Sequence, residues 1–361
     1  MEFRYKYGSL PLPVFFPDAT KAVIKTLDSA DIESTKTLGI LVNTFHLWQG
    51  LGKSLFKKYE GIREFMNWKG AVISDSGGFQ VMSVIKTGEL KGKIVDEGAI
   101  FYPSRKKKMI LTPEKSIRFQ MELKSDMVVT LDDFTDLKAN YDQAKESVER
   151  TISWAKRSKD EYVKIVKQKK LSVKQRPYIL GVVQGGEFQD LRRYCARELM
   201  KIGFDGYGYG GWPISADGSF DYTSAKTIVD EVGKDCFLYG LGIGKPEEVV
   251  GMVELGYNIF DCVLPTRDAR HGRLYVYNFE STKDIDIKKE KFYSFYSPDK
   301  EKYYYDSSPV SLACDCLLCK KYSKAYLAHL FRIKDTAAMR LSSIHNLRFY
   351  SILMQKLQKG E

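Results

Sequence analysis

Short apolar runs alternate along the chain with longer stretches in which apolar residues recur at helical spacing. The runs have the length and the Val, Ile and Leu content of buried strands, and most end in a polar residue or a pair of glycines; they cover residues 38–45, 71–74, 127–131, 178–183, 207–209, 236–241 and 259–264. Helical spacing is clearest in residues 141–166 and 188–202. Near-continuous apolar strands separated by helices predict an α/β fold with a parallel sheet covered on its faces.

The residues that follow these runs favour one form of such a sheet. Asp75, Asp132, Gln184, Gly211 and Asp261 each lie at or just beyond the end of a run. A closed (β/α)8 TIM-type barrel gathers the carboxyl ends of its strands at one mouth, so it would bring all five together. An open doubly wound sheet is the alternative, but the chain lacks a Gly-x-Gly-x-x-Gly after a first strand and an acidic residue placed for a ribose. We therefore expect a barrel.

Composition and charge narrow the setting. The 361 residues, 43% of them hydrophobic, suffice for one large barrel and an appendage. A net charge of +11 indicates a polyanionic partner, although basic runs such as residues 164–174 and 288–291 are also typical of solvated faces. The first residues are interrupted by charges and no run reaches 18 apolar residues, so we expect a cytoplasmic protein with no membrane association.

A carboxylate directly precedes a cluster of arginines near the end of the barrel pattern. Asp261 lies in an apolar run that we expect Pro265 to stop, and Arg267, Arg270 and Arg273 follow within a dozen residues. The pairing suggests a nucleophile beside a phosphate clamp. A loop-capping aspartate with solvated arginines fits this segment equally well, so other segments must decide.

The six cysteines fall into two groups. Cys195, Cys236 and Cys262 stand singly in strand or helix patterns, as small buried hydrophobes do. The other three crowd into Cys-Asp-Cys-Leu-Leu-Cys, a spacing that suits a tetrahedral zinc site needing one more ligand; they are Cys314, Cys316 and Cys319. Spacing alone leaves both His329 and His345 open as the fourth. A closed Cys3His set has no position for a substrate, so such a metal would be structural.

Many ordered segments together resemble one family, the bacterial-type tRNA-guanine transglycosylases, also called queuine tRNA-ribosyltransferases. The most specific are Asp75-Ser-Gly-Gly-Phe-Gln-Val-Met and Phe260-Asp-Cys-Val-Leu-Pro-Thr-Arg. Further matches lie at residues 43–48, 68–70, 183–186, 190–193, 202–207, 242–246 and 346–350, so the resemblance spans nearly the whole chain. The resemblance also selects His345 over His329 as the fourth zinc ligand. It implies an irregular (β/α)8 barrel over residues 1–280, with a zinc-binding subdomain and carboxyl-terminal helices over residues 281–361.

The resemblance further implies an activity and roles for individual residues. Such enzymes exchange the wobble guanine of U-G-U anticodon loops in tRNA for a 7-deazaguanine, through a covalent enzyme-RNA intermediate. Asp261 matches the nucleophile and Asp75 the general acid/base. The base-binding positions correspond to Asp132, Gln184, Gly211, Phe79, Leu241 and Trp212, and the tRNA-binding positions to Thr266, Arg267 and Arg270. Relatives pair partly through the zinc region, so a homodimer is also expected.

The chain departs from the family pattern beside the expected base pocket. Phe134 replaces a small cysteine, and Trp212 and Pro213 alter the loop that reads the 7-substituent of the incoming base. Pro213 has no amide donor, and Ala216 cannot replace the supporting glutamate. Asp133 or Asp136 are the acidic residues that could compensate. The inserted base is therefore prequeuosine-1 or, given the reshaped pocket, queuine, prequeuosine-0 or a related deazaguanine.

Three other functions share part of this pattern. A DNA-modifying relative could use the same chemistry, although the segment from Thr266 to Arg270 favours tRNA. A non-catalytic accessory subunit would need neither Asp75 nor Asp261. A barrel hydrolase with paired aspartates would need a metal motif in the barrel, which the sequence lacks. Transglycosylation of tRNA is the prediction that accounts for the most residues.

Overall fold

Eight parallel strands form the centre of the molecule. The computed structural model describes residues 2–86, 88, 91–104, 107–215 and 217–360. Hydrogen bonds join the strands in the order β3, β13, β12, β11, β10, β9, β5, β4. They are β3 (Val14–Pro17), β4 (Gly39–Asn43), β5 (Ala71–Asp75), β9 (Met127–Val129), β10 (Tyr178–Val183), β11 (Gly206–Tyr209), β12 (Phe237–Gly240) and β13 (Ile259–Cys262). An isolated parallel bridge between Asp18 and Leu41 brings the two outer strands together, and the predicted barrel class is confirmed.

One barrel strand was not predicted, and another is shorter than predicted. The apolar pattern did not reveal β3, because prolines at positions 11, 13 and 17 gave that segment the look of a loop. The run at 259–264 is also shorter than expected as a strand. It ends at Cys262, and Leu264–Arg270 form helix α11 with Pro265 in its first turn, where a missing N–H costs nothing. Arg267 and Arg270 therefore lie on this helix, and Arg273 follows it.

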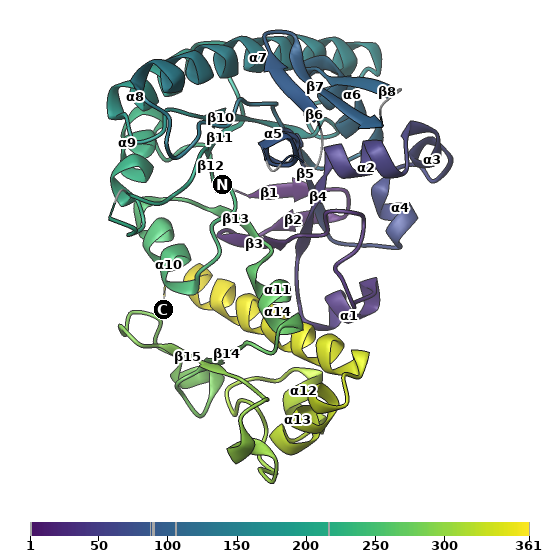
Figure 1. The fold of residues 1–361 in the computed structure, drawn as a ribbon, viewed down its shortest axis with the longest axis vertical. Helices are drawn as coiled ribbons and strands as arrows, with labels where there is room; N and C mark the ends of the chain where they lie inside the picture. The colour runs from purple at the N-terminus through teal and green to yellow at the C-terminus, as the bar shows by residue number, and fades with distance from the viewer. Residues whose placement is uncertain (1, 87, 89–90, 105–106, 216, 361) are drawn as a thin grey trace.

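Helices cover the outside of the barrel (Figure 1). The two predicted from spacing are α7 (Tyr141–Gln168), which begins with a capping box between Asn140 and Gln143, and α8 (Gln189–Ile202). The others around the barrel are α2 (Thr44–Gly50), α3 (Lys53–Lys58), α4 (Ile62–Met66), α5 (Gly78–Lys86), α6 (Pro113–Leu123), α9 (Tyr222–Val232) and α10 (Pro246–Leu255), with α1 (Ser29–Ser34) near the start. No helix in the described part of the chain combines the length and apolar character needed to cross a bilayer.

Two small sheets make the barrel irregular. The hairpin of β1 (Phe3–Tyr5) and β2 (Gly8–Leu10) places the Phe3 ring against Phe16, Tyr178 and Phe237. Three antiparallel strands, β6 (Lys91–Val95), β7 (Gly98–Ser104) and β8 (Lys107–Leu111), lie between α5 and α6 in the chain. The hairpin fills the amino-terminal end of the barrel, which leaves the carboxyl-terminal end for a site.

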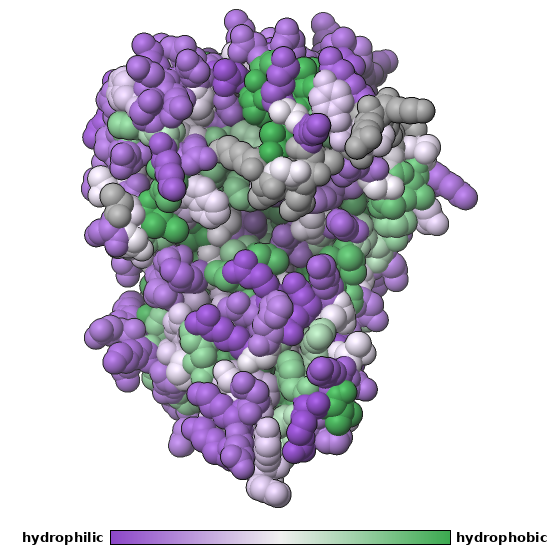
Figure 2. All heavy atoms as spheres, viewed as in Figure 1, coloured by the Kyte–Doolittle hydropathy of each residue, from purple (hydrophilic) through white to green (hydrophobic). Residues whose placement is uncertain are grey.

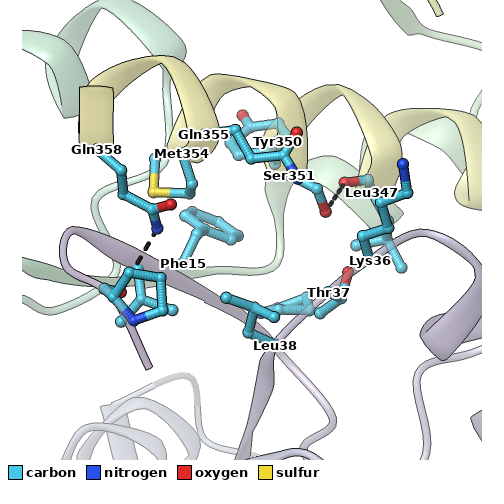
Figure 3. Close-up of a pocket in the computed structure, with 13 residues that line it drawn as sticks. Phe15, Lys36, Thr37, Leu38, Leu347, Tyr350, Ser351, Met354, Gln355 and Gln358 are labelled. Carbon is cyan, nitrogen blue, oxygen red and sulfur yellow. Dashed lines mark hydrogen bonds between the residues drawn. The ribbon is translucent and has the colours of Figure 1, made fainter. Parts of the chain in front are cut away.

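The carboxyl-terminal part packs against the barrel through one long helix. Helix α14 (Thr336–Lys359) runs between the barrel and a region made of β14 (Leu274–Tyr277), β15 (Tyr293–Tyr296), α12 (Leu317–Lys321) and α13 (Lys324–Arg332) (Figure 1). The pocket of Figure 3 lies where α14 faces β3, with Phe15, Leu38, Tyr350 and Met354 in its lining. Phe15 thus points out of the barrel, as the alternation of side chains along a strand requires of one neighbour in two.

Candidate active site

Alternation along the barrel strands delivers polar residues to one end of the interior. Ile73, Val182 and Ile259 point into the barrel core, and the residue two positions further along each strand is polar. Those residues are Asp75, Gln184 and Asp261, at the carboxyl ends of β5, β10 and β13. Since the strands are parallel, the three side chains meet at the barrel mouth, as predicted.

Asp261 is held through one of its two oxygens. Its Oδ1 accepts hydrogen bonds from the Tyr239 hydroxyl, at 2.8 Å, and from the Gly242 N–H, at 3.0 Å. Among the described residues, Oδ2 accepts no hydrogen bond that competes with a substrate. Burial raises the pKa of Asp261 to about 7, although the two hydrogen bonds act in the opposite direction. The carboxyl group is therefore oriented and has one oxygen available to react.

Asp75 lies at the end of β5, and a residue of the neighbouring strand β4 holds its side chain. The Asn43 side chain donates to Asp75 Oδ2 at 2.8 Å, and Asn43 is its register partner on β4. Burial raises the pKa of Asp75 to about 6, against the effect of the Gly77 and Ser76 N–H groups. Gly77 has φ +85°, and a Cβ there would lie 2.6 Å from Phe45 Cβ, so the turn after Asp75 requires glycine. A carboxyl group with such a pKa can exchange a proton near neutrality.

A second polar pair lies deeper in the mouth. Gln184 Nε2 donates to Asp132 Oδ2 at 2.6 Å, and Gln184 Oε1 accepts from the Thr135 N–H at 3.2 Å. Both side chains are buried, and burial raises the pKa of Asp132 to about 7. A Cβ on Gly210 would lie 2.6 Å from Gln184 Nε2, so β11 can approach the pair only with glycine at that position. The pair offers hydrogen-bonding groups of the kind that the edge of a purine presents.

Three aromatic rings gather beside this pair. The ring centroid of Phe79 lies 4.9 Å from that of Phe134 and 5.8 Å from that of Trp212, and Phe134 and Trp212 are also 5.8 Å apart. We call these residues the aromatic cover. Phe79 and Trp212 remain 38% and 46% exposed, which leaves part of each ring open to a flat ligand. The sequence singled out each ring separately but did not predict that the three touch.

The remaining base-binding candidates line the same mouth. Gly211, with φ +92°, follows β11, and a Cβ there would lie 3.6 Å from Gln184 Oε1. Leu241 is half-buried and packs over Gly208, whose missing side chain makes room for it. Asp133, one of the two acidic residues that could compensate for the altered loop, is buried and accepts a hydrogen bond from Arg150. Ala216 lies outside the described residues.

Helix α11 follows Asp261 directly and carries the three tRNA-binding candidates. Thr266 is buried, and its hydroxyl donates to the Val263 carbonyl at 3.3 Å. Arg267 is exposed, whereas Arg270 is half-buried and donates to the Thr266 carbonyl at 2.9 Å. The surface over α11 is strongly hydrophilic (Figure 2). The helix therefore offers two guanidinium groups near the mouth, and Thr266 anchors it.

The three clustered cysteines meet a histidine from α14. The sulfur atoms of Cys314, Cys316 and Cys319 and a ring nitrogen of His345 all lie within 4.8 Å of one another. His345 Nδ1 is 3.2 Å from Cys319 Sγ, and Nε2 is 2.8 Å from the Tyr275 carbonyl oxygen, which leaves Nδ1 as the ligand atom. His329 is exposed on α13 and takes no part. The four residues form a group that could bind a metal ion.

Comparisons with known proteins agree with this arrangement. The model of the family described as queuine tRNA-ribosyltransferase matches residues 2–360. The chain belongs to this family. Similar proteins include a queuine tRNA-ribosyltransferase of Vibrio cholerae, 36% identical over 99% of this chain and 87% of the relative. Proteins of the same name from Shewanella sp. (strain W3-18-1) and Shewanella putrefaciens are each 37% identical over 97% of this chain and 87% of the relative. The family predicted from the motifs is thus confirmed.

Two residues at the barrel mouth were not predicted from the sequence. Tyr239, which orients Asp261, lies inside the predicted run 236–241. Its inward-facing position on that strand was the one feature that could have identified it. Asp18 follows the missed strand β3 as a polar residue after an apolar run, the same signal that identified the other carboxylates. Finding that strand would have found the residue.

Proposed function

We propose that this protein exchanges the wobble guanine of U-G-U anticodon loops in tRNA for a 7-deazaguanine, by double displacement at the ribose C1′. The observation that carries the proposal is the geometry of Asp261. One oxygen is fixed by Tyr239 and Gly242, and the other accepts no hydrogen bond from the described residues; a polar pair suited to a purine edge lies beside it. A nucleophile that forms a covalent intermediate needs this combination of orientation and a free lone pair.

The first displacement removes guanine. Asp261 Oδ2 attacks C1′, the bond from C1′ to N9 breaks, and Asp75 gives a proton to N9 as the base leaves. In the second displacement Asp75 takes the proton from N9 of the incoming base, N9 attacks C1′, and the ester bond to Asp261 breaks. Two inversions retain the configuration at C1′. A pKa of about 6 for Asp75 suits a group that must both give and accept a proton near neutral pH.

The base is held at its edge and on its face. The carboxyl group of Asp132 and the amide of Gln184 match the donors and acceptors along the edge of guanine, with the Gly211 backbone alongside. Phe79 and Leu241 would cover the two faces of the ring, and an aromatic stacking contact contributes roughly 1 to 3 kcal/mol. A departing guanine and an arriving deazaguanine share that edge, so one pocket serves both.

The aromatic cover and the altered loop next to it bear on which base enters the pocket. Pro213 offers no amide to a 7-substituent, and Asp133 already accepts a hydrogen bond from Arg150. Recognition of the bare ammonium of prequeuosine-1 by Asp133 is therefore disfavoured, which leaves Asp136 as the other acidic residue that could take this role. Shape against Phe134 and Trp212 would select instead, and queuine, prequeuosine-0 or a related deazaguanine would be preferred. Insertion of prequeuosine-1 at ordinary efficiency, with the others ignored, would overturn this part.

The metal proposed for the Cys3His group is zinc. Three thiolates and one imidazole nitrogen within 4.8 Å of one another fit a tetrahedral zinc shell, and the bond from His345 Nε2 to Tyr275 orients the ring. The shell has no open position, so zinc would hold α12 and α14 together and take no part in the base exchange. It would stabilise the region that supports α11, because Asn346 donates to the Pro265 and Arg273 carbonyls at 2.8 and 3.0 Å.

Binding of tRNA and pairing of two subunits complete the proposal. Arg267 and Arg270 would contact phosphates next to the target nucleotide, and the net charge of +11 would add a general attraction for RNA. A homodimer through the zinc region is supported by its exposed apolar residues, which are Leu312, Leu317, Tyr322, Tyr326 and Ile333. Affinity for tRNA should fall steeply between about 50 and 200 mM salt, and a flat response would count against phosphate contacts.

Mass spectrometry of nucleosides tests the function directly. A tRNA with a U-G-U anticodon loop is incubated with the protein and a mixture of guanine, prequeuosine-1, prequeuosine-0 and queuine, and then digested. One deazaguanosine at the wobble position would establish the reaction and identify the base. No incorporation by a protein that still binds the tRNA would overturn the proposal, and labelling of DNA in a parallel reaction would assign the chemistry to another substrate.

A further inference from the structure

The strand next to the Asp261 strand ends in a further carboxylate, Asp18. In β3, Phe16 points into the barrel core and Phe15 points outward to α14 (Figure 3). By the same alternation Asp18 points inward, two residues beyond Phe16. Phe16 is the register partner of Asp261 in the parallel pairing of β3 with β13. Asp18 therefore lies on the neighbouring strand, two residues closer to the barrel mouth than the level of Asp261.

Asp18 is fixed in the seam that closes the barrel. The Ala19 N–H donates to the Leu41 carbonyl at 2.7 Å, and the Asn43 N–H donates to the Thr20 carbonyl at 3.3 Å. The Thr20 hydroxyl donates to Asp18 Oδ1. The Asp18 side chain is partly exposed at the mouth, as those of Asp75 and Asp261 are. One carboxylate oxygen thus holds the turn, and the side chain remains partly exposed.

Charge interactions couple Asp18 to Asp75, to the nucleophile and to the arginine helix. Burial is the main cause of the raised pKa of Asp75 and of Asp261, and the negative charge of Asp18 adds to both. Burial and the charge of Arg267 lower the pKa of Arg270, and Asp18 opposes them. Asp18 is therefore close to Asp75, Asp261 and Arg270 together.

The layout of the mouth decides which part of a nucleotide faces Asp18. Asp132, Gln184 and Gly211, which would hold the base, follow the adjacent strands β9, β10 and β11. The ribose joined to Asp261 then lies toward β13, β3 and β4. A carboxylate only accepts hydrogen bonds and repels phosphate. In a nucleotide inside an RNA chain the 3′ and 5′ oxygens are esterified, so the 2′-hydroxyl is the one donor that the ribose offers.

We propose that Asp18 accepts a hydrogen bond from the 2′-hydroxyl of the target nucleotide and thereby makes the base exchange selective for RNA over DNA. This inference rests on the proposed function, since it requires a nucleotide attached to Asp261. It assigns Asp18 as a ribose-binding residue, in addition to its part in the turn with Thr20.

The test uses two anticodon stem-loops with a U-G-U loop that differ only in the 2′ position of the target nucleotide, one ribose and one deoxyribose. Guanine exchange is followed with labelled base for the full-length protein and for Asp18→Ala. For the ribose substrate, kcat/KM should fall about ten- to a hundredfold in the variant, the effect of losing a hydrogen bond to a charged group. For the deoxyribose substrate the fall should be at least about tenfold smaller, because any effect of the lost charge on Asp75 and Asp261 is common to both substrates.

Controls separate this proposal from the turn and from the function as a whole. Asp306 accepts hydrogen bonds from the Ser308 N–H and hydroxyl in the same kind of turn, so Asp306→Ala should leave both rates unchanged. Equal losses of Asp18→Ala on both substrates would overturn the proposal and make Asp18 a purely structural residue, and no loss on either would overturn it too. Failure of the unaltered protein to exchange the ribose substrate would instead reject the proposed function.

Discussion

The barrel mouth and the Cys3His group are both built from ionisable side chains. They differ in how far the polar atoms of those side chains have favourable partners. In the Cys3His group, four ligand atoms face one another and His345 also has a backbone partner. In the mouth, Asp75, Asp132 and Asp261 are crowded, and each has a pKa raised to about 6 or 7 by burial. The closed group is suited to stability, whereas the crowded one keeps reactive groups at an energetic cost.

The largest effect should come from the reacting oxygen of the mouth. Asp261→Asn keeps an acceptor for Tyr239 and Gly242 but removes the nucleophile, so base exchange should fall by about four orders of magnitude or more. Single-turnover assays with labelled guanine would measure it. Asp235→Asn, the same change at an exposed position, should exchange at the normal rate. Turnover by Asp261→Asn within tenfold of normal would remove Asp261 from the chemistry.

The same substitution should stabilise the fold at high pH. The pKa of Asp261 rises from 3.8 to about 7 on folding, so its favourable contribution is complete below pH 3.8 and is lost as the pH rises through about 7. Asn has no charge to bury, and at pH 8 we expect Asp261→Asn to unfold with about 1–2 kcal/mol more free energy than the unaltered protein. Urea denaturation at pH 8 and pH 5 would measure the difference, which should shrink at pH 5.

In the Cys3His group, removing a ligand should cost stability without removing a group that takes part in the base exchange. Cys316→Ser should lose the zinc ion proposed for this group and destabilise the carboxyl-terminal region by on the order of 4 kcal/mol, since loss of a metal is among the largest effects of a single change. Metal content and denaturant unfolding would report it. Cys236→Ser, a cysteine far from the group in sequence and only half-buried, should retain its metal. A Cys316→Ser protein with a full complement of metal would exclude this residue as a ligand.

The aromatic cover should affect the base more than the tRNA. Trp212→Ala removes a ring that contacts both Phe79 and Phe134, and the KM for the incoming base should rise about tenfold, as expected for one lost stacking contact. The KM for tRNA should change little. Tyr305→Ala removes an almost fully exposed aromatic residue elsewhere and serves as the control. Equal changes in both KM values would mean that Trp212 supports the mouth in general.

The smallest predicted effect concerns the orientation of the nucleophile. The Tyr239 hydroxyl stabilises the charged form of Asp261, so Tyr239→Phe should raise the pKa of that carboxyl group further. The acid limb of the pH–rate profile, which should lie near pH 7, would then move up by about half to one pH unit. An unchanged limb with a reduced maximum rate would show that Tyr239 acts through packing alone.

Sequence patterns predicted the barrel and most of the mouth because both depend on local signals. An apolar run that ends in a polar residue located Asp75, Asp132 and Asp261, and Cys-Asp-Cys-Leu-Leu-Cys located three of the four clustered ligands. Strand β3 was hidden by prolines, and Asp18 was missed with it. Contacts between distant segments gave no signal at all, such as the meeting of Phe79 on α5 with two rings from separate loops, or the salt bridge between Asp133 and Arg150.

Trapping of the covalent intermediate tests the central claim most directly. The protein is incubated with a U-G-U stem-loop RNA without any added base, denatured, and digested, and the peptide that carries the RNA is found by mass spectrometry. The expected result is a ribose adduct on the peptide with Asp261, absent from Asp261→Asn and lost when a deazaguanine is added first. An adduct on any other residue, or ready exchange by a protein that never forms one, would contradict double displacement at Asp261.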